Sequence, residues 1–257
     1  TFDYPKSFFD QRMHQVRRQS PDIEEISSAA ELLMSAKRPI IIAGGGVQYS
    51  GAVSELTNFA KIHNIPIVET IAGRANLLDR DPLNIGPIGV TGSNSANTIA
   101  NKADLIIAVG TRLQDFTTGS WTVFSMDSKF ISINAARHDA TKHLSLPIVG
   151  DAKLALTILS KACSGLKASS EWMSFAQDER KKWDAYVSDN ISVVNNRPNS
   201  YAQAIGVVNT ICDKRDRLVA AAGGLPAEVT ANWRTLDIGT VDVEFGFSCM
   251  GYEIAGA

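Results

Sequence analysis

Three consecutive glycines, Gly44 to Gly46, are the first residues along the chain whose type and spacing could support chemistry. They follow a short apolar run and precede a predicted helix, a context in which backbone amides and a helix N-terminus can bind phosphate. Gly45 and Gly46 are therefore candidate nucleotide-binding residues. The triplet lacks the spacing of the dinucleotide fingerprint, however, and glycines that only form a tight strand-to-helix turn explain it equally well.

A second candidate site follows the apolar run at residues 105–109, which we expect to be the third strand of a parallel sheet. Open α/β sheets bind ligands where their strands end, and an arginine there can pair with a phosphate through two hydrogen bonds. Gly110 and Arg112 are therefore further candidate nucleotide-binding residues. In the alternative interpretation Arg112 pairs with Asp115 and only holds the loop. The glycine-rich stretch at 86–92 permits close approach of a flat ligand, or simply forms turns.

The histidines and cysteines do not form a recognisable catalytic or metal site. No histidine has metal-ligand spacing, so we interpret all four as structural or surface residues: His14, His63, His138 and His143. The cysteines are odd in number and far apart, which indicates free thiols in a reducing cytoplasm: Cys163, Cys212 and Cys249. No serine lies in a nucleophile elbow. We predict neither a catalytic residue nor a metal ligand within this chain.

The composition is that of an ordinary globular protein. Of 257 residues, 44% are hydrophobic and 20% charged, with a net charge of −2. This charge favours neither a nucleic-acid nor a membrane partner, and no apolar run is long enough to span a bilayer. The length suggests one full domain and part of another. Because the chain starts at Thr1 and ends in a helix-compatible run without a stop signal, we expect a segment of a longer protein.

The apolar pattern predicts an α/β fold. Strands are expected at residues 40–42, 65–68, 105–109, 130–133 and 147–149, because these runs are apolar on both faces. Helices are expected at 24–36, 52–63, 95–102 and 151–162. The alternation predicts an open parallel sheet flanked by helices, forming a central domain at 26–165 that follows a surface linker at 1–25.

A different pattern begins after this domain. Residues 166–199 are predicted to be a connector with a polar helix at 171–187, and a new unit occupies 200–257. The new unit opens with a helix at 201–212, a strand at 218–222 and a glycine turn. One such unit cannot bury its own faces, so we interpret it as the incomplete start of a second α/β domain.

Many of these residues together resemble the central domain of thiamine-diphosphate enzymes, in the acetolactate-synthase-like branch. The similarity covers about residues 30–165 and rests on the glycine triplet and on the following residues: 65–68, Thr70, Gly73, Arg74, Gly86, Gly89, Gly92, 103–106, Gly110, Arg112, Asp115, Gly119 and 150–152. The resemblance implies a full-length enzyme that uses thiamine diphosphate and Mg²⁺, acts on a small-molecule substrate and forms a homo-oligomer, either a dimer or a tetramer.

The second unit resembles the start of that family's diphosphate-binding domain, which implies a set of cofactor-binding residues: Ala222, Gly223, Gly224, Leu225, Ser248 and Met250. In the family, the strand-end loop meets the cofactor phosphates. Met250 matches the apolar wedge beneath the bent cofactor, and the Ser248 carbonyl and Met250 amide would bond its aminopyrimidine ring. The family's Mg²⁺-binding motif and its activating glutamate would lie outside residues 1–257, so we expect the isolated chain to be inactive.

The segments 134–143, 221–226 and 244–253 resemble most a branch that hydrolyses a carbon–carbon bond of a cyclic polyhydroxy dione in inositol catabolism. The alternatives are an acetolactate-synthase-like ligase or decarboxylase, and a nucleotide-binding module without catalysis. Some relatives bind flavin or an adenine nucleotide in the central domain. Asn134 stands where flavin-binding members carry aspartate, so we expect a structural, oligomer-forming domain, with an adenine nucleotide as the alternative.

Overall fold

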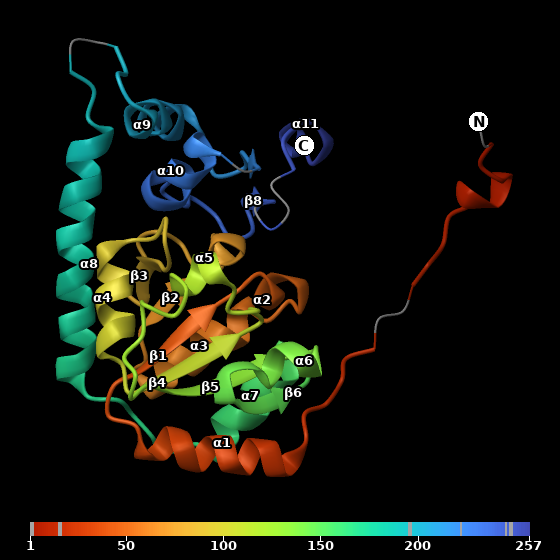
Figure 1. Cartoon of the computed structure of the whole chain (residues 1–257), viewed down its shortest axis with the longest axis vertical. Coiled ribbons are helices and arrows are strands. Elements are labelled where there is room, and N and C mark those ends of the chain that lie inside the picture. Colours follow the sequence, from red (N-terminus) through yellow and green to blue (C-terminus); the bar gives the residue numbers. More distant parts are fainter. Residues whose placement is uncertain (1–2, 15–16, 195–196, 222, 245, 247–248) are drawn as a thin grey trace.

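The structure is a computed structural model that describes residues 3–14, 17–194, 197–221, 223–244, 246 and 249–257. A six-stranded sheet forms its centre, and every strand pairs in parallel with its neighbours in the order β3-β2-β1-β4-β5-β6 (Figure 1). The strands are β1 (Pro39–Ala43), β2 (Ile67–Glu69), β3 (Asn84–Pro87), β4 (Leu105–Val109), β5 (Lys129–Asn134) and β6 (Leu146–Val149). The predicted open parallel sheet is confirmed.

Helices cover both faces of this sheet. One face packs against α1 (Ile23–Ser35), α3 (Val53–His63) and α7 (Ala152–Ala162), and the other against α4 (Asn94–Lys102) and α8 (Ser170–Ile191). Successive side chains of a strand point to opposite faces, so Ile41 lies in the first core while Ile40 and Ile42 lie in the second. Being buried on both sides explains why the central strands are continuous apolar runs.

Side-chain caps fix where several of these helices begin. The carboxylate of Asp22 accepts a hydrogen bond from the Glu24 amide at 2.7 Å, as its position before the first apolar repeat predicted. Ser93 and Ser169 cap α4 and α8 in the same way. The remaining short helices of the central region are α2 (Gly46–Tyr49), α5 (Asp115–Thr118) and α6 (Arg137–Ala140), with 3₁₀ turns at Ile71–Gly73 and Lys142–Leu144.

The edge strand β3 was not predicted. Its last two residues, Gly86 and Pro87, fall in the stretch at 86–92 that was interpreted as a glycine-rich loop, and both residue types are uncommon in strands. Proline is tolerated at a sheet edge, where a missing amide costs no ladder hydrogen bond, and Gly86 adopts a φ of 113°. The run at 105–109 is consequently the fourth strand along the chain and not the third, and it lies beside β1 at the middle of the sheet.

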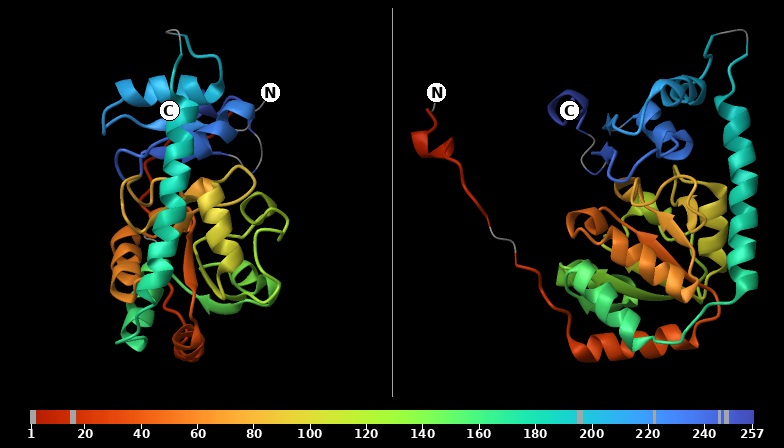
Figure 2. Two further views of the ribbon diagram at one scale, coloured as in Figure 1. Left: turned by 90° about the vertical axis from the view of Figure 1, so that its left-hand side faces the viewer. Right: turned by 180° about the vertical axis from the view of Figure 1, so that it is seen from behind.

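A long helix leads to the second unit. Helix α8 runs along one side of the molecule and is longer at both ends than the predicted helix at 171–187 (Figure 2). The second unit contains α9 (Tyr201–Ile211), β7 (Leu218–Ala220), α10 (Gly224–Asn232), β8 (Val241–Val243) and α11 (Tyr252–Ala255). Strands β7 and β8 form a separate two-stranded parallel sheet. The expectation of a single strand followed by a glycine turn therefore missed α10 and β8.

The second unit packs on the central domain. Its small core includes Ala75 of the central region together with Ile205, Val229, Trp233 and Val241. The N-terminal residues behave differently, since 3–14 lead away from the body of the molecule and include a short 3₁₀ helix at Lys6–Phe8 (Figure 1). The chain meets the surface near Arg18, whose guanidinium bonds Asp151 at 2.8 Å.

Candidate functional site

The glycine triplet lies at the carboxyl end of β1, in contact with the loop that follows β4. A β-carbon on Gly44 would lie 2.3 Å from the carbonyl oxygen of Gly110, and one on Gly46 would lie 2.8 Å from the Gly110 α-carbon. A β-carbon on Gly45 would lie 2.8 Å from the carbonyl oxygen of Ala72. The Gly44 amide already donates to the Val109 carbonyl. Close packing of loops therefore accounts for the triplet, while the nucleotide-binding role of Gly45, Gly46 and Gly110 stays a prediction.

Arg112 projects from the loop between β4 and α5. Its Nη2 lies 3.4 Å from Gln114 Oε1, and no ion pair joins Arg112 to Asp115, both of which the structure describes. The interpretation in which these two residues pair to hold the loop is therefore wrong. The Arg112 side chain is exposed, and Nη2 lies 3.7 Å from the position of a β-carbon on Gly246. Arg112 thus faces the segment that follows β8 in the second unit.

Asn134, at the end of β5, uses its side chain to join two loops. Its Nδ2 donates to the Thr111 carbonyl at 3.1 Å, and its Oδ1 accepts from the Ala136 amide at 2.9 Å. Both ends of the amide are therefore engaged within the protein. This geometry gives Asn134 a structural role between the two loops.

The predicted diphosphate loop is the start of helix α10. Gly223 precedes the helix with a φ of 134°, a backbone conformation that residues other than glycine rarely adopt, and as a glycine it has no side chain to cap the helix. The first amides of a helix have no partner within it, and Pro226 has none to offer. The amides of Gly224 and Leu225 are therefore the donors that an anion at this end of α10 would meet. Ala222 lies outside the described residues.

The predicted aminopyrimidine segment precedes α11. Met250 is 87% exposed, and Gly251 has a φ of 97°. An apolar cavity of about 270 Å³ is lined by Leu225 and Pro226 of α10 and by Glu253 of α11, with further walls from α9 and β7. Of the predicted cofactor residues that the structure describes, Leu225 lines this cavity, and Glu253, three residues after Met250, lies on its wall. The cofactor-binding role of the two segments stays a prediction. Ser248 lies outside the described residues.

Sequence analysis missed a group of charged residues between the two units. Arg74 Nη1 lies 2.6 Å from Glu69 Oε2 and both side chains are buried, while Arg74 Nη2 donates to the Trp233 carbonyl at 2.8 Å. Burial raises the pKa of Glu69, and the charge of Arg74 and the hydrogen bonds from Arg74 and Leu77 oppose that rise. The available signal was an acidic residue at the end of an apolar strand, with an arginine five positions later.

A second charged group lies beside the first. Asp79 forms ion pairs with Arg180 at 2.8 Å and with Arg234 at 3.3 Å. Asp184 pairs with the same two arginines, with Arg180 at 2.8 Å and with Arg234 at 2.9 Å. These four residues come from the central region, α8 and the second unit. They form a continuous ion-pair network across the junction.

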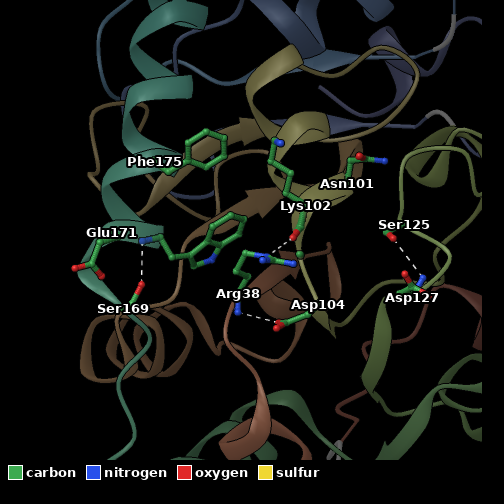
Figure 3. A pocket seen from close by; sticks show the side chains of 11 residues that line it. Arg38, Asn101, Lys102, Asp104, Ser125, Asp127, Ser169, Glu171 and Phe175 are labelled. Atoms are coloured by element: carbon green, nitrogen blue, oxygen red, sulfur yellow. Dashed lines mark hydrogen bonds between the residues drawn. The ribbon is translucent and has the colours of Figure 1, made fainter.

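A hollow of about 570 Å³ lies at the opposite end of the sheet, where β1 and β4 begin (Figure 3). Arg38 and Lys102 line it beside Phe175 and Trp172, and the Trp172 ring nitrogen donates to the Pro39 carbonyl at 2.9 Å. Asp104 holds the amide of Arg38 at 2.8 Å. Open α/β sheets bind their ligands at the carboxyl ends of strands, so this hollow is not the site that the fold predicts.

The described residues contain neither a metal-binding group nor a membrane-spanning helix. No three His, Cys, Asp or Glu side chains converge there as a metal-binding group. His63 is buried with both ring nitrogens near hydrogen-bond partners, Leu166 O at 3.0 Å and Ser160 Oγ at 3.3 Å, which confirms its structural interpretation. Within the same residues, no helix has both the length and the apolar character required to cross a bilayer.

Comparisons with known proteins agree with this geometry. A family model described as the thiamine pyrophosphate enzyme, central domain, matches residues 26–159. The whole chain is 37% identical to a 3D-(3,5/4)-trihydroxycyclohexane-1,2-dione hydrolase of Geobacillus thermodenitrificans, of which it covers 43%. It is 36% identical to the protein of the same name from Bacillus anthracis, of which it covers 44%. The chain therefore spans less than half the length of these relatives.

Proposed function

Because this chain belongs to the thiamine pyrophosphate enzymes, we propose that it forms part of a thiamine-diphosphate-dependent hydrolase that opens a cyclic polyhydroxy dione in inositol catabolism. The observation that carries the proposal is that the likeness to the dione hydrolases extends over the entire chain, including the second unit with its α10 loop and Met250. An acetolactate-synthase-like ligase or decarboxylase would share the central domain, whereas the relatives that match the whole chain at 36–37% identity carry the hydrolase name.

The residues of the second unit fit part of the cofactor. The uncapped start of α10 offers the Gly224 and Leu225 amides to the diphosphate, and the positive end of the helix dipole favours its charge. Met250 is exposed enough to contact the thiazolium and pyrimidine rings from below. When bound, the cofactor supplies the carbanion chemistry that breaks a carbon–carbon bond beside a carbonyl, while the protein supplies placement.

We propose that the isolated chain binds the cofactor negligibly and does not turn over substrate. Among the residues that the structure describes, the second unit forms a two-stranded sheet, and no metal-ligand group is present that could hold Mg²⁺ against the diphosphate. Isothermal titration of the chain with thiamine diphosphate and Mg²⁺ tests this statement. Micromolar binding would contradict it.

We also propose that the central domain is structural and contributes to a cytoplasmic homo-oligomer, a dimer or a tetramer. The glycines that could accept a nucleotide are packed against neighbouring loops, and both ends of the Asn134 amide are occupied. Light scattering of the full protein gives its oligomeric state, and titration with FAD and ADP tests for a nucleotide. Binding of either nucleotide at micromolar concentration would show that the domain is more than structural.

The assay of the proposed reaction uses the full protein that contains this chain. With trihydroxycyclohexane-1,2-dione we expect ring opening that depends on added thiamine diphosphate and Mg²⁺, measured as acid release. Pyruvate serves as the control substrate, since an acetolactate-synthase-like enzyme would consume it. Turnover of pyruvate without turnover of the dione would replace the hydrolase with that alternative.

A further inference from the structure

The two units of the chain meet through a buried arginine. Arg74 is 3% exposed and Glu69 is fully buried, and their side chains are 2.6 Å apart. The second Glu69 oxygen accepts from the Leu77 amide at 2.9 Å, so this carboxylate is fully engaged within the central domain. Arg74 uses Nη1 for Glu69, and its Nη2 donates to the Trp233 carbonyl in the second unit at 2.8 Å.

This contact depends on the shape of the guanidinium group. Its planar fork can donate to two separate acceptors at once, whereas an ammonium group is a single nitrogen. Glu69 neutralises the charge of Arg74 through Nη1. The other terminal nitrogen, Nη2, is therefore free of Glu69 and can bond the Trp233 carbonyl of the second unit. Moving Arg74 away from its partners would leave a buried charge uncompensated, which is strongly destabilising. The guanidinium is therefore held in one position.

Arg234, the residue after Trp233, is held by separate contacts. Arg234 bonds Asp79 of the central region and Asp184 of α8, and its backbone amide donates to Asn209 Oδ1 at 2.8 Å. The amide of Asp79 in turn donates to the Thr235 carbonyl at 3.1 Å. The end of α10 is therefore fixed to the central domain over three consecutive residues, with the Arg74 bond as its first and most buried tie.

Helix α10 carries this restraint to the proposed cofactor site. The helix has nine residues, Gly224–Asn232, and Trp233 directly follows it. A helix of that length spans about 14 Å and moves as a rigid rod, so a shift at Trp233 also displaces Gly224. The amides proposed to receive the diphosphate thus depend on what holds the opposite end of the helix.

We propose that Arg74 is a positioning residue for thiamine diphosphate, which fixes the diphosphate-binding start of α10 by anchoring its far end to the central domain. The inference rests on the proposed function. Preorganisation of a binding loop lowers the entropy that binding must overcome, so loss of the anchor weakens cofactor binding. A cofactor at saturating concentration restores the loop, and turnover under that condition changes little.

The anchor itself is tested on the 257-residue chain by amide hydrogen exchange, without any cofactor. In Arg74→Met we expect exchange in α9, β7 and α10 to become about tenfold faster, with β1 and β4 unchanged. Arg18→Met is the matched control, because Arg18 bonds Asp151 and Ser50 of the central region and has no hydrogen-bond partner among the described residues of the second unit. Equal exchange of α10 in the parent chain and in Arg74→Met would overturn the anchor.

The positioning role is tested by kinetics of the full protein. For Arg74→Met we expect the KM for thiamine diphosphate to rise about tenfold, with kcat at saturating cofactor within about twofold of the parent. Arg74→Lys keeps a charge beside Glu69 but cannot donate to both acceptors in the same geometry, so a smaller rise in KM is expected. Should Arg74→Met not fold, Arg74→Lys decides the question.

The outcomes separate the inference from the function on which it rests. If both variants had the same KM for thiamine diphosphate as the parent protein and differed only by a lower Tm, the positioning role would be overturned and Arg74 would be purely structural. A full protein that hydrolyses the dione without thiamine diphosphate would instead reject the proposed function. The exchange measurement on the isolated chain reports on the anchor in either case.

Discussion

The carbonyl oxygen of Gly110 lies 2.3 Å from the position that a β-carbon on Gly44 would occupy. The loops that end β1 and β4 therefore touch through their backbones, and the Gly46 amide closes the contact by donating to that same carbonyl at 3.0 Å. The glycines of this region serve the close approach of two strand-end loops at the middle of the sheet.

Replacement of Gly44 by alanine should lower the free energy of unfolding by about 1–3 kcal/mol, because the added methyl group forces backbone atoms apart. Urea denaturation measures the loss. The matched control is Gly246→Ala, whose β-carbon would meet Arg112 at an ordinary 3.7 Å and should cost far less. Equal stability of Gly44→Ala and the parent would show that the loops separate easily.

Replacement of His63 by leucine should destabilise the chain by about 1–3 kcal/mol, because the buried Leu166 carbonyl and Ser160 hydroxyl both lose their partner. Thermal and urea unfolding provide the measurement. His138→Leu is the control, since His138 is exposed on the short helix α6. A His63→Leu variant as stable as this control would mean that the imidazole contributes only its volume.

Burial raises the pKa of the Cys163 thiol to about 11, above its ordinary value of 9.0. The unfolded chain then releases this proton before the folded chain does, so the thiol's contribution is complete below pH 9 and is lost as the pH rises toward 11. Relative to Cys163→Ala, the parent should lose about 2 kcal/mol over that interval. Urea unfolding of both proteins at pH 8, 9.5 and 10.5 shows the trend, and parallel curves would contradict it.

Asp151 shows the opposite dependence on pH. Burial alone would raise its pKa, but hydrogen bonds from Ser50 and Arg18 outweigh burial and hold the pKa below the ordinary 3.8. The carboxylate therefore stabilises the fold above pH 3.8, and this contribution disappears as the pH falls through the lower folded value.

The variant that tests this dependence is Asp151→Asn, which should be about 1–2 kcal/mol less stable than the parent at pH 7, with the gap narrowing below pH 3.8. Asp178→Asn, on an exposed ion pair of α8, should show almost no gap at neutral pH. A gap for Asp151→Asn that stays constant from pH 7 to pH 3 would mean that its charge is not what stabilises the start of α7.

The central sheet could be predicted from the sequence because its inner strands are apolar on both faces. The run at 105–109 is bounded in the structure as predicted, and Asp22 caps α1 as its position suggested. The edge strand β3 could not be predicted, since an edge strand needs no continuous apolar run and Gly86 and Pro87 disguise it. Helix α10 was missed for a similar reason. Its first turn contains Gly224 and Pro226, and both residue types usually mark turns.

The candidate site also has a part that could be predicted from the sequence and a part that could not. Sequence similarity indicated the segments at 222–225 and at Met250. Leu225 of the first segment lines a cavity together with Glu253, which lies three residues after Met250. The partners of Arg74 could not be found from the sequence, because Trp233 lies 159 positions away and contributes a backbone carbonyl, which every residue possesses. The alternative in which Arg112 pairs with Asp115 failed because the Arg112 guanidinium lies near Gln114 and Gly246 instead.

The central claim, that the start of α10 and the segment at Met250 together bind thiamine diphosphate, is tested most directly by amide exchange of the full protein with and without saturating cofactor and Mg²⁺. We expect exchange to slow at least about threefold at residues 223–232 and 249–255, with helix α1 unchanged. Saturated binding that leaves both segments exchanging at their original rates would contradict the claim.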